Sequence, residues 1–588
     1  MSRILLILLS ILVSFSSFSQ SEKKDGRRVI IPREYSDIHH EGERALLMKR
    51  YHEAIRLFKR VLKKYPDFPP ALRSMGACYE MTGDYEKATR YYEAALESNP
   101  YFSRALYFEI ANIHYKCGRY DLALQSFERF DSLLHEDPKQ FTYNGFEEQK
   151  VEEKYYALLD ASRRACRIAL DSIRFWNITG VENLGSAINT KADEYFPFLT
   201  NDGQTLFYTS RKDEQSDENL FVSQYNGNGW DNGSKVPGFN TRQNEGMTTL
   251  VRDGQHLFFT ACERESVLGT CDIWRARVDG GEVFDARPLP GMLNSDAWES
   301  QASISCDGSV LYFASNRPGG HGGTDIWKCT RLPNGDWSQP VNLGSHINTP
   351  GDEEAPFITN DAKTLYFSST GHIGLGEQDI FMSRLSGENF WSLPVNLGMP
   401  VNSSYRELGF FLSADGRTGY FASDRAGGQG GMDIYRFDLP DPLQSTPITY
   451  VQGTVIDSIT GLPVVATVVV KDRQTFLTDD DGRFFLCVQA GHTLDIKILH
   501  KDYHPYRRLF GVPEWDNATF FPLNIALDPL FKLPDYNELI GAKPSMVSLK
   551  YSIGKQLKHN VLFDFDEAKL KVESIKELER FLREVFEE

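Results

Sequence analysis

The feature that most constrains the fold is a short segment that recurs five times in the middle of the chain. It reads "NDGQTLFYTS", "RDGQHLFFTA", "CDGSVLYFAS", "NDAKTLYFSS" and "ADGRTGYFAS". The aspartates of the five copies are spaced 51, 54, 54 and 54 residues apart: Asp202, Asp253, Asp307, Asp361 and Asp415. Each copy joins a turn to one apolar strand, and a second strand follows. A repeat of this length with about four short strands predicts an array of small antiparallel sheets.

The turn and the strand of this repeat each carry a local signal. Asp-Gly between apolar runs predicts a tight hairpin, because both turn positions favour a positive φ. Ala362 replaces the glycine in the fourth copy, so that turn is expected to be longer or of another type. Paired aromatic residues in the strand, such as Phe258 and Phe259, predict burial on both faces.

The repeat resembles a blade of the TolB-like, WD-repeat-like propellers across residues 172–440. The resemblance implies a five-bladed β-propeller. "ITGVENLGSAINT" precedes the first copy and matches the strand that ends later copies, as in "QPVNLGSHINT", whereas the fifth copy stops at "DIYRFDLP". The first strand is therefore expected to complete the last blade, which would pair both free sheet edges.

A glutamate stands eight residues before each turn aspartate. The five are Glu194, Glu245, Glu299, Glu353 and Glu407. Two interpretations remain open. The carboxylates could form an acidic ring at one mouth of the channel that binds a cation or a basic partner loop. Alternatively, each carboxylate accepts hydrogen bonds from backbone donors or from a hydroxyl group in the neighbouring blade.

A second repeat, of about 34 residues, lies within residues 36–171. The segment "PPALRSMGACYEMTGDYEKATRYYEAALESNP" has small and aromatic residues, among them Gly76, Ala88 and Tyr92, at the spacing of a tetratricopeptide repeat, which it resembles. Small residues let two helices approach closely, and aromatic residues fill the space between helix pairs. The resemblance implies an α-solenoid that binds a peptide or protein, or a spacer that binds nothing.

Two further segments resemble known domains. Residues 447–530 keep "GTVIDSITGLPV", "TDDDGRF" and "KDYHPY" in the order of the carboxypeptidase regulatory-like domain, which implies a small β-sandwich for docking without peptidase activity. A linker at 531–555 follows. Residues 556–588, with "NVLFDFDEAKL", resemble the start of an OmpA-like peptidoglycan-binding domain. The segments that bind peptidoglycan in that family do not follow. The domain is therefore expected to be incomplete, and the sequence is expected to be a fragment of a longer chain.

The N-terminus predicts export. Residues 1–20 combine one positive charge, an apolar core and small residues, which is typical of a cleaved signal peptide. No later stretch reaches about 18 continuous apolar residues, so no membrane span is expected. Cys262 and Cys271, at the ends of "CERESVLGTC", could meet across a hairpin and form a disulfide, and buried free thiols are expected at the other cysteines. A formal charge of −17 disfavours nucleic acid as a partner.

The order of these parts resembles the OmpA-family multidomain envelope proteins, similar to the peptidoglycan-associated component of the Bacteroidetes type IX secretion system. This resemblance implies a non-catalytic periplasmic scaffold associated with the outer membrane or cell wall. Its repeats would bind envelope proteins, and it would bind peptidoglycan only if the C-terminal domain were completed. The expected fold is multidomain α plus all-β.

The alternatives are a peptide- or glycan-binding propeller without a secretion role, and a propeller hydrolase. The sequence has neither Gly-x-Ser-x-Gly nor His-Glu-x-x-His, so no catalytic residue is assigned. No cofactor or metal is expected either. The pair His39 and His40 is expected on a solvated helix surface rather than as two metal ligands.

Overall fold

The chain is described from a computed structural model. The described residues are 31–143, 145–175, 178, 180–212, 217–264, 266–279, 282–332, 335–387, 390–471, 474–514, 519–530, 550–553 and 555–558. The expected signal peptide at 1–20 lies outside them. So does the linker at 531–555, except 550–553 and 555, and so does the expected OmpA-like start at 556–588, except 556–558.

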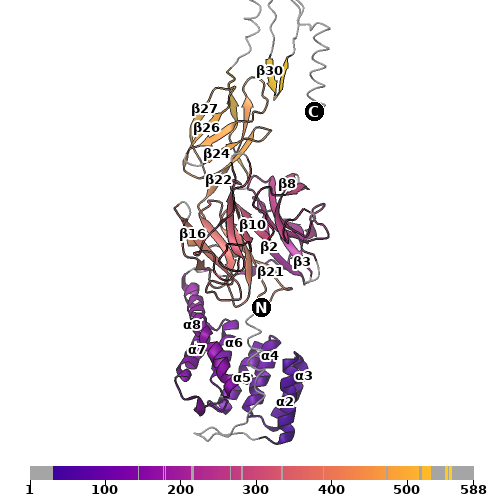
Figure 1. Cartoon of the computed structure of the whole chain (residues 1–588), viewed down its shortest axis with the longest axis vertical. Coiled ribbons are helices and arrows are strands. Elements are labelled where there is room, and N and C mark those ends of the chain that lie inside the picture. The colour runs from indigo at the N-terminus through magenta and orange to yellow at the C-terminus, as the bar shows by residue number, and fades with distance from the viewer. Residues whose placement is uncertain are drawn as a thin grey trace, which may run out of the picture.

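Three regions follow one another along the chain. Figure 1 shows a helical region at one end of the long axis, a group of small sheets in the middle and a two-sheet region beyond it. We call them the helical region, the five-sheet region and the sandwich. No helix among the described residues combines the length and the apolar character needed to cross a bilayer.

Seven α-helices build the helical region. They are α2 (Arg33–Leu47), α3 (Tyr51–Lys64), α4 (Pro69–Met81), α5 (Tyr85–Ser98), α6 (Ala105–Lys116), α7 (Tyr120–Leu134) and α8 (Phe146–Phe175), with a 3-10 turn η1 (Pro138–Gln140) before α8. Successive helices pack as pairs, and α8 packs against α6 and α7. A Cβ atom on Gly76 would lie 2.3 Å from the ring of Tyr92, and one on Gly42 would lie 2.6 Å from Phe58. Glycine is therefore required where α2 meets α3 and where α4 meets α5.

Five antiparallel sheets follow, one for each copy of the repeat. The first sheet contains β2 (Asp193–Leu199), β3 (Thr205–Arg211), β4 (Asn219–Gln224) and β5 (Ser234–Lys235). The second contains β6 (Glu245–Leu250), β7 (His256–Cys262), β8 (Cys271–Asp279) and β9 (Glu282–Pro288). The third contains β10 (Glu299–Ile304), β11 (Val310–Ser315), β12 (Asp325–Thr330) and β13 (Val341–Asn342).

The last two sheets differ in their outer strands. The fourth contains β14 (Glu353–Ile358), β15 (Thr364–Ser369), β16 (Asp379–Ser386), β17 (Phe390–Trp391) and β18 (Val395–Asn396). The fifth contains β19 (Glu407–Leu412), β20 (Thr418–Ser423), β21 (Asp433–Asp438) and β1 (Glu182–Asn183). Because β1 pairs with β21, the strand that precedes the first sheet completes the fifth, as the sequence predicts.

The first strands of the five sheets lie next to one another. β2 contacts both β6 and β19, and parts of all five first strands line one cavity of about 40 Å³. Each of these strands contains a bulge with one residue at positive φ, for example Gln301 at 55°. The second strands supply the core, in which Phe259, Phe313, Phe367 and Phe421 are fully buried.

The turn that joins the first two strands of each sheet differs from the expected hairpin. The glycine has a positive φ, but the aspartate does not; the Asp202 carboxylate instead accepts a hydrogen bond from the Gln204 N–H at 3.0 Å. The fourth turn is neither longer nor different, so that prediction was wrong. Ala362 adopts a φ of 54°, and its N–H donates to the Thr359 carbonyl at 2.8 Å. Ala362 therefore has the same left-handed conformation as the glycines of the other copies, although this conformation is strained for alanine.

The sandwich has two sheets. One contains β22 (Ile448–Asp457), β25 (Arg483–Gln489), β28 (Phe521–Pro522) and β29 (Ile525–Leu527), and the other contains β23 (Thr467–Val470), β24 (Gln474–Leu477), β26 (Thr493–Leu499) and β27 (Tyr506–Gly511). A 3-10 turn, η2 (Asp441–Leu443), precedes it, and a separate hairpin joins β30 (Lys550–Ile553) to β31 (Lys555–Lys558). β25 and β24 are edge strands of the two sandwich sheets.

Two disulfides occur among the described residues. One joins Cys262 to Cys271 across β7 and β8, at the pair that the sequence singled out. The other joins Cys306 to Cys487, 181 residues apart, and ties the five-sheet region to the sandwich. The expectation that all remaining cysteines are free was therefore wrong, because the fold brings these two distant residues together.

Candidate interaction sites

The five repeated glutamates lie in buried hydrogen-bond networks. Glu194 is 1% exposed, and the other four are fully buried. Each accepts hydrogen bonds from the backbone N–H and the hydroxyl group of the serine or threonine four residues earlier. At Glu353, for example, both donors belong to Thr349 at 2.6 Å, and the Ser369 hydroxyl adds a third bond at 2.7 Å. Buried, fully engaged carboxylates cannot present an acidic ring to solvent, so this geometry favours the hydrogen-bonding interpretation.

In three sheets an arginine joins this network. The Glu299 carboxylate lies 3.0 Å from Arg317, whose guanidinium also lies over the Phe313 ring at 5.1 Å. Arg264 pairs with Glu245 and Arg425 pairs with Glu407 in the same way. A planar guanidinium can satisfy a buried carboxylate and pack on an aromatic ring at once.

A second kind of residue, not identified from the sequence, also recurs where one sheet connects to the next. An asparagine stands five residues before each glutamate: Asn189, Asn240, Asn294, Asn348 and Asn402. Each side chain pairs with both backbone groups of one residue in the preceding sheet or, for Asn189, in the fifth. Asn348 accepts from the Ile326 N–H at 2.8 Å and donates to the Ile326 carbonyl at 3.0 Å. The five-of-five spacing was a sufficient signal for finding these residues.

Aspartates at the start of the third strands hold the neighbouring loops. The Asp433 carboxylate accepts hydrogen bonds from the Gln429 and Gly430 N–H groups at 2.5 and 3.2 Å. Asp379 holds the Leu375–Gly376 loop in the same way. Burial raises the pKa of Asp379 well above its ordinary value, and the Glu407 carboxylate raises it further. Burial also raises the pKa of Glu407, although Arg425 opposes this effect.

The helical region contains a buried network of charges. Arg73 of α4 pairs with Glu109 of α6 at 2.5 Å and with Glu148 of α8 at 3.1 Å. Arg104 also pairs with Glu152 of α8. These ion pairs connect helices of different repeats, so they set the relative positions of the helices more than they add to stability.

The helical region also contacts the five-sheet region. The Tyr115 hydroxyl donates to the Leu375 carbonyl, and the Ser404 hydroxyl donates to the Lys116 carbonyl at 3.4 Å. Leu375 is buried in a cluster with Tyr120 of α7 and Ala169 of α8. The loop held by Asp379 and the segment around Ser404 therefore both contact the helices.

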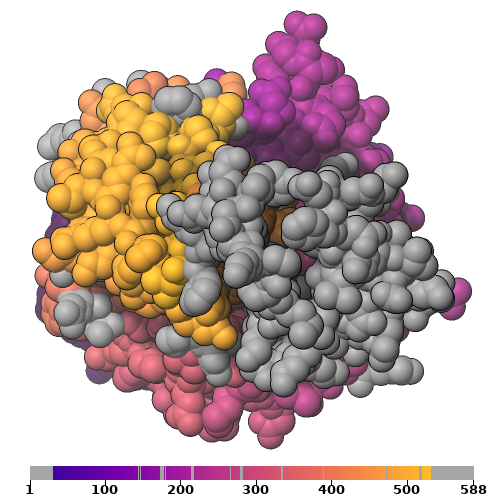
Figure 2. Space-filling model, turned by 90° about the horizontal axis from the view of Figure 1, so that it is seen from above, coloured from indigo at the N-terminus to yellow at the C-terminus, as the bar shows by residue number. Residues whose placement is uncertain are grey.

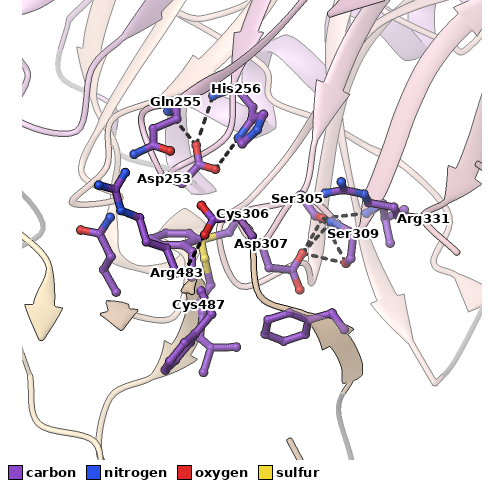
Figure 3. A pocket seen from close by; sticks show the side chains of 18 of the residues that line it. Asp253, Gln255, His256, Ser305, Cys306, Asp307, Ser309, Arg331, Arg483 and Cys487 are labelled. Atoms are coloured by element: carbon purple, nitrogen blue, oxygen red, sulfur yellow. Dashed lines mark hydrogen bonds and ion pairs between the residues drawn. A yellow bond between two sulfur atoms is a disulfide. The ribbon is translucent and has the colours of Figure 1, made fainter. Parts of the chain in front are cut away.

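A groove lies between the five-sheet region and the sandwich. It has a volume of about 950 Å³ and is lined by the second, third and fourth sheets on one side and by residues of β22 to β25 on the other. The space-filling view along the long axis shows the sandwich, in orange and yellow, over the five-sheet region (Figure 2). Figure 3 shows Arg483 and Cys487 from the sandwich facing Asp253, Cys306 and Asp307. The Asn360 amide donates to the Tyr450 hydroxyl at 2.9 Å and helps to join the two sides.

One group of three described residues could hold a metal ion. Ligand atoms of His39, His40 and Glu43 lie within 4.8 Å of one another. His39 is 6% exposed and packs against Phe58 and Phe68, so its expected place on a solvated surface was wrong. Burial lowers the pKa of His39 to about 4 and raises that of Glu43 to about 7. A structural zinc ion takes four ligands, so this group alone is one ligand short.

Comparison with known proteins identifies one part of the chain. Two models of the tetratricopeptide repeat match residues 45–100 and 82–139. The helical region therefore contains tetratricopeptide repeats, as the sequence predicts, and these repeats form a protein–protein interaction module. Among curated proteins no relative matches this sequence.

Several solved structures show limited similarity. The Sgt2 tetratricopeptide domain from Aspergillus fumigatus is 20% identical, with 24% of this chain and 87% of that chain covered and a TM-score of 0.19. PcrH in complex with the chaperone binding region of PopD is 18% identical, with 23% and 96% covered and a TM-score of 0.20. A structure described as a glycoside hydrolase is 10% identical, with 46% and 94% covered and a TM-score of 0.35. Similarities this weak carry no argument about function.

Proposed function

We propose that this chain is a non-catalytic periplasmic scaffold that holds partner proteins through its helical region. In this proposal the five sheets form a five-bladed TolB-like propeller, and the sandwich is a carboxypeptidase regulatory-like domain. A completed OmpA-like domain would link the scaffold to peptidoglycan. The assembly it serves would be an outer-membrane machine of the type IX secretion kind.

The observation that carries the proposal is the match of residues 45–139 to tetratricopeptide repeats. Two joints support it further. The helical region packs on the loop around Leu375, and the Cys306–Cys487 disulfide ties the sandwich to the five-sheet region. Fixed joints suit a scaffold, because they keep a constant distance between the sites where partners bind.

Site-specific photo-crosslinking in the source cells tests this proposal. A photoreactive residue would replace Glu86 or Arg90, which are exposed on α5, in the full chain. Crosslinks from these positions to an outer-membrane protein assembly are expected. The matched control places the same residue at Asn228, on an exposed loop of the first sheet. Crosslinks only to cytoplasmic proteins, or the same partners from both regions, would contradict the proposal.

Cell-wall attachment needs a separate measurement. Purified peptidoglycan sacculi would be sedimented with the native protein, and the intact mass of that protein would be measured. We expect co-sedimentation only if the native mass exceeds that of the 588-residue sequence after signal removal. Co-sedimentation of a protein that ends at Glu588 would show that another region binds the wall.

A further inference from the structure

A cluster of arginines lines one part of the groove between the five-sheet region and the sandwich. Arg275 and Arg277 lie on β8, Arg287 lies on β9, and Arg331 directly follows β12 of the next sheet. Arg275 stands opposite Arg287 in the pairing of β8 with β9. Arg275 and Arg277 are two residues apart on one strand, so their side chains emerge from the same face.

These arginines have few acidic partners. Arg287 pairs with Asp285 at 3.2 Å. Among the described residues, no ion pair or side-chain hydrogen bond is found for Arg275, Arg277 or Arg331. Burial lowers the pKa of Arg275, and the charges of Arg287 and Arg331 lower it further, whereas Asp285 opposes this effect. Like charges held this close repel one another, and an anionic ligand would relieve that repulsion.

Two acidic residues of the same groove, Asp253 and Asp307, accept hydrogen bonds within their own turns. Asp253 accepts from the Gln255 N–H at 2.8 Å and contacts His256 at 2.7 Å. Asp307 accepts from the Ser305 and Ser309 hydroxyl groups, as Figure 3 shows. Within the described part of the chain, Asp285 is therefore the groove carboxylate that pairs with the arginine cluster, and Asp253 and Asp307 form no ion pair with it. The protein as a whole carries a formal charge of −17.

The opposite wall of the groove offers backbone groups. Residues of β24 and β25 line it, and each of these strands stands at the edge of its sheet. An edge strand can pair with an added strand through its main-chain N–H and carbonyl groups. Arg483, at the start of β25, adds a guanidinium group on this side and lies 3.8 Å from the Asp481 carboxylate.

We propose that this groove binds an acidic peptide segment in extended conformation. Carboxylates at alternate positions of an extended chain point to one side and repeat at about twice the rise of 3.3 Å per residue. This spacing suits the arginines on β8 and β9, which would bind the carboxylates through paired N–H groups. The peptide backbone would add to the β24 or β25 edge. This site is separate from the helical region and does not depend on the scaffold proposal.

Fluorescence anisotropy with a defined probe tests the site. The probe is a fluorescein-labelled ten-residue peptide of alternating Glu and Thr, added to the full chain. We expect saturable binding that weakens as salt rises, because the contacts are between charges. The double variant Arg275→Gln/Arg331→Gln should bind at least tenfold more weakly. Arg508→Gln on β27, at the far edge of its sandwich sheet from β24, is the matched control and should bind like wild type.

A second pair of probes separates peptide binding from general attraction of anions. The same peptide with N-methyl groups on alternate residues keeps its charge but cannot pair as a strand, so it should bind at least tenfold more weakly. Inorganic polyphosphate should compete poorly. The proposal is overturned if an alternating Lys and Thr peptide binds as well, or if the arginine variant binds like wild type. It is also overturned if polyphosphate competes fully and N-methylation has no effect, which would indicate a site for non-peptide polyanions.

Discussion

The helical region and the five-sheet region are both built from repeats, but their repeats are joined by different forces. In the helical region a glycine on the first helix allows close contact with an aromatic ring on the second, as at Gly76 and Tyr92. In the five-sheet region, an asparagine in each connection bonds the backbone of the preceding sheet, as Asn348 does, and a glutamate bonds the backbone of the connection itself, as Glu353 does. Complementary shape therefore determines how the helices pack in the first region, and buried hydrogen bonds determine how the sheets connect in the second. We call these contacts the helical joint and the polar joint.

The difference has a physical reason. A helix satisfies its own backbone, so two helices need only complementary surfaces. A small sheet ends in loops with unpaired N–H and carbonyl groups, and these need partners when the loops are buried between sheets. The two regions can be followed separately, because six of the eight tryptophans lie in the five-sheet region. Helical circular dichroism then reports mainly on the first region, and tryptophan fluorescence reports mainly on the second.

The largest effect is expected where the shape of the helical joint is broken. Gly76→Val places a side chain where a Cβ atom alone would lie 2.3 Å from Tyr92. Overpacking of this kind should lower the free energy of unfolding of the helical region by about 3 kcal/mol. The measurement is urea denaturation followed at 222 nm. Gly145→Val, where a Cβ atom meets nothing within 4 Å, is the control and should stay within about 0.5 kcal/mol of wild type.

A slightly smaller effect is expected where the polar joint is broken. Asn348→Ala leaves the buried N–H group of Ile326 without its acceptor, and the Ile326 carbonyl keeps the Leu343 N–H as a donor. The free energy of unfolding of the five-sheet region should fall by about 2 kcal/mol. Tryptophan fluorescence in urea measures it, and the helical signal should not shift. Asn228→Ala, at an exposed loop, is the control; equal losses in the two variants would show that the joint contributes nothing.

A pH dependence should distinguish the two kinds of joint further. The folded state raises the pKa of Asp379, whereas in the unfolded chain this carboxyl group releases its proton near pH 4. Between these values the folded protein binds more protons, so this contribution to stability is present at low pH and is lost as pH rises above about 4. Asp379→Asn should flatten the fall of the fluorescence midpoint between pH 4 and pH 7.

The variant Gly145→Val provides the comparison for this experiment, because it changes no titrating group. It should keep the wild-type slope of midpoint against pH. A slope that is equally steep in Asp379→Asn would mean that other groups cause the dependence.

The smallest effect concerns a turn rather than a joint. Ala362 adopts a φ of 54°, and this conformation is less favourable for alanine than for glycine because alanine has a Cβ atom. Ala362→Gly should stabilise the five-sheet region by about 0.5 kcal/mol, less than the full strain because glycine also gains freedom in the unfolded chain. The reverse change Gly203→Ala, at a φ of 68° in the first sheet, should destabilise it. Loss of stability in Ala362→Gly would contradict this account of the turn.

Much of the β fold could be predicted from local spacing. The regular interval between Asp202 and Asp415 indicated five sheets, and "ITGVENLGSAINT" indicated the strand that completes the fifth. The recurring glutamates were found, but two interpretations remained because spacing does not report burial. The asparagines five residues earlier carried an equally regular signal and were overlooked.

Other features could not be derived from the sequence at all. Cys306 and Cys487 lie in different regions and share no pattern, so their disulfide follows only from how the sandwich sits on the sheets. Arg275 and Arg287 lie on two strands, Arg331 follows a third, and no sequence pattern connects them. His39 was placed on a solvated surface, because its neighbours along the chain do not include Phe58 and Phe68.

The sequence by itself determined the kinds of element, the number of repeats in the β region and the tetratricopeptide character of the first region. These follow from periodicity, since side chains at fixed intervals share a face of a helix or a sheet. Only the tertiary structure decided which carboxylates are buried, which cysteines meet and where the arginines gather. Those outcomes depend on contacts between residues far apart in the chain, and burial and the charges brought close by folding set their energies.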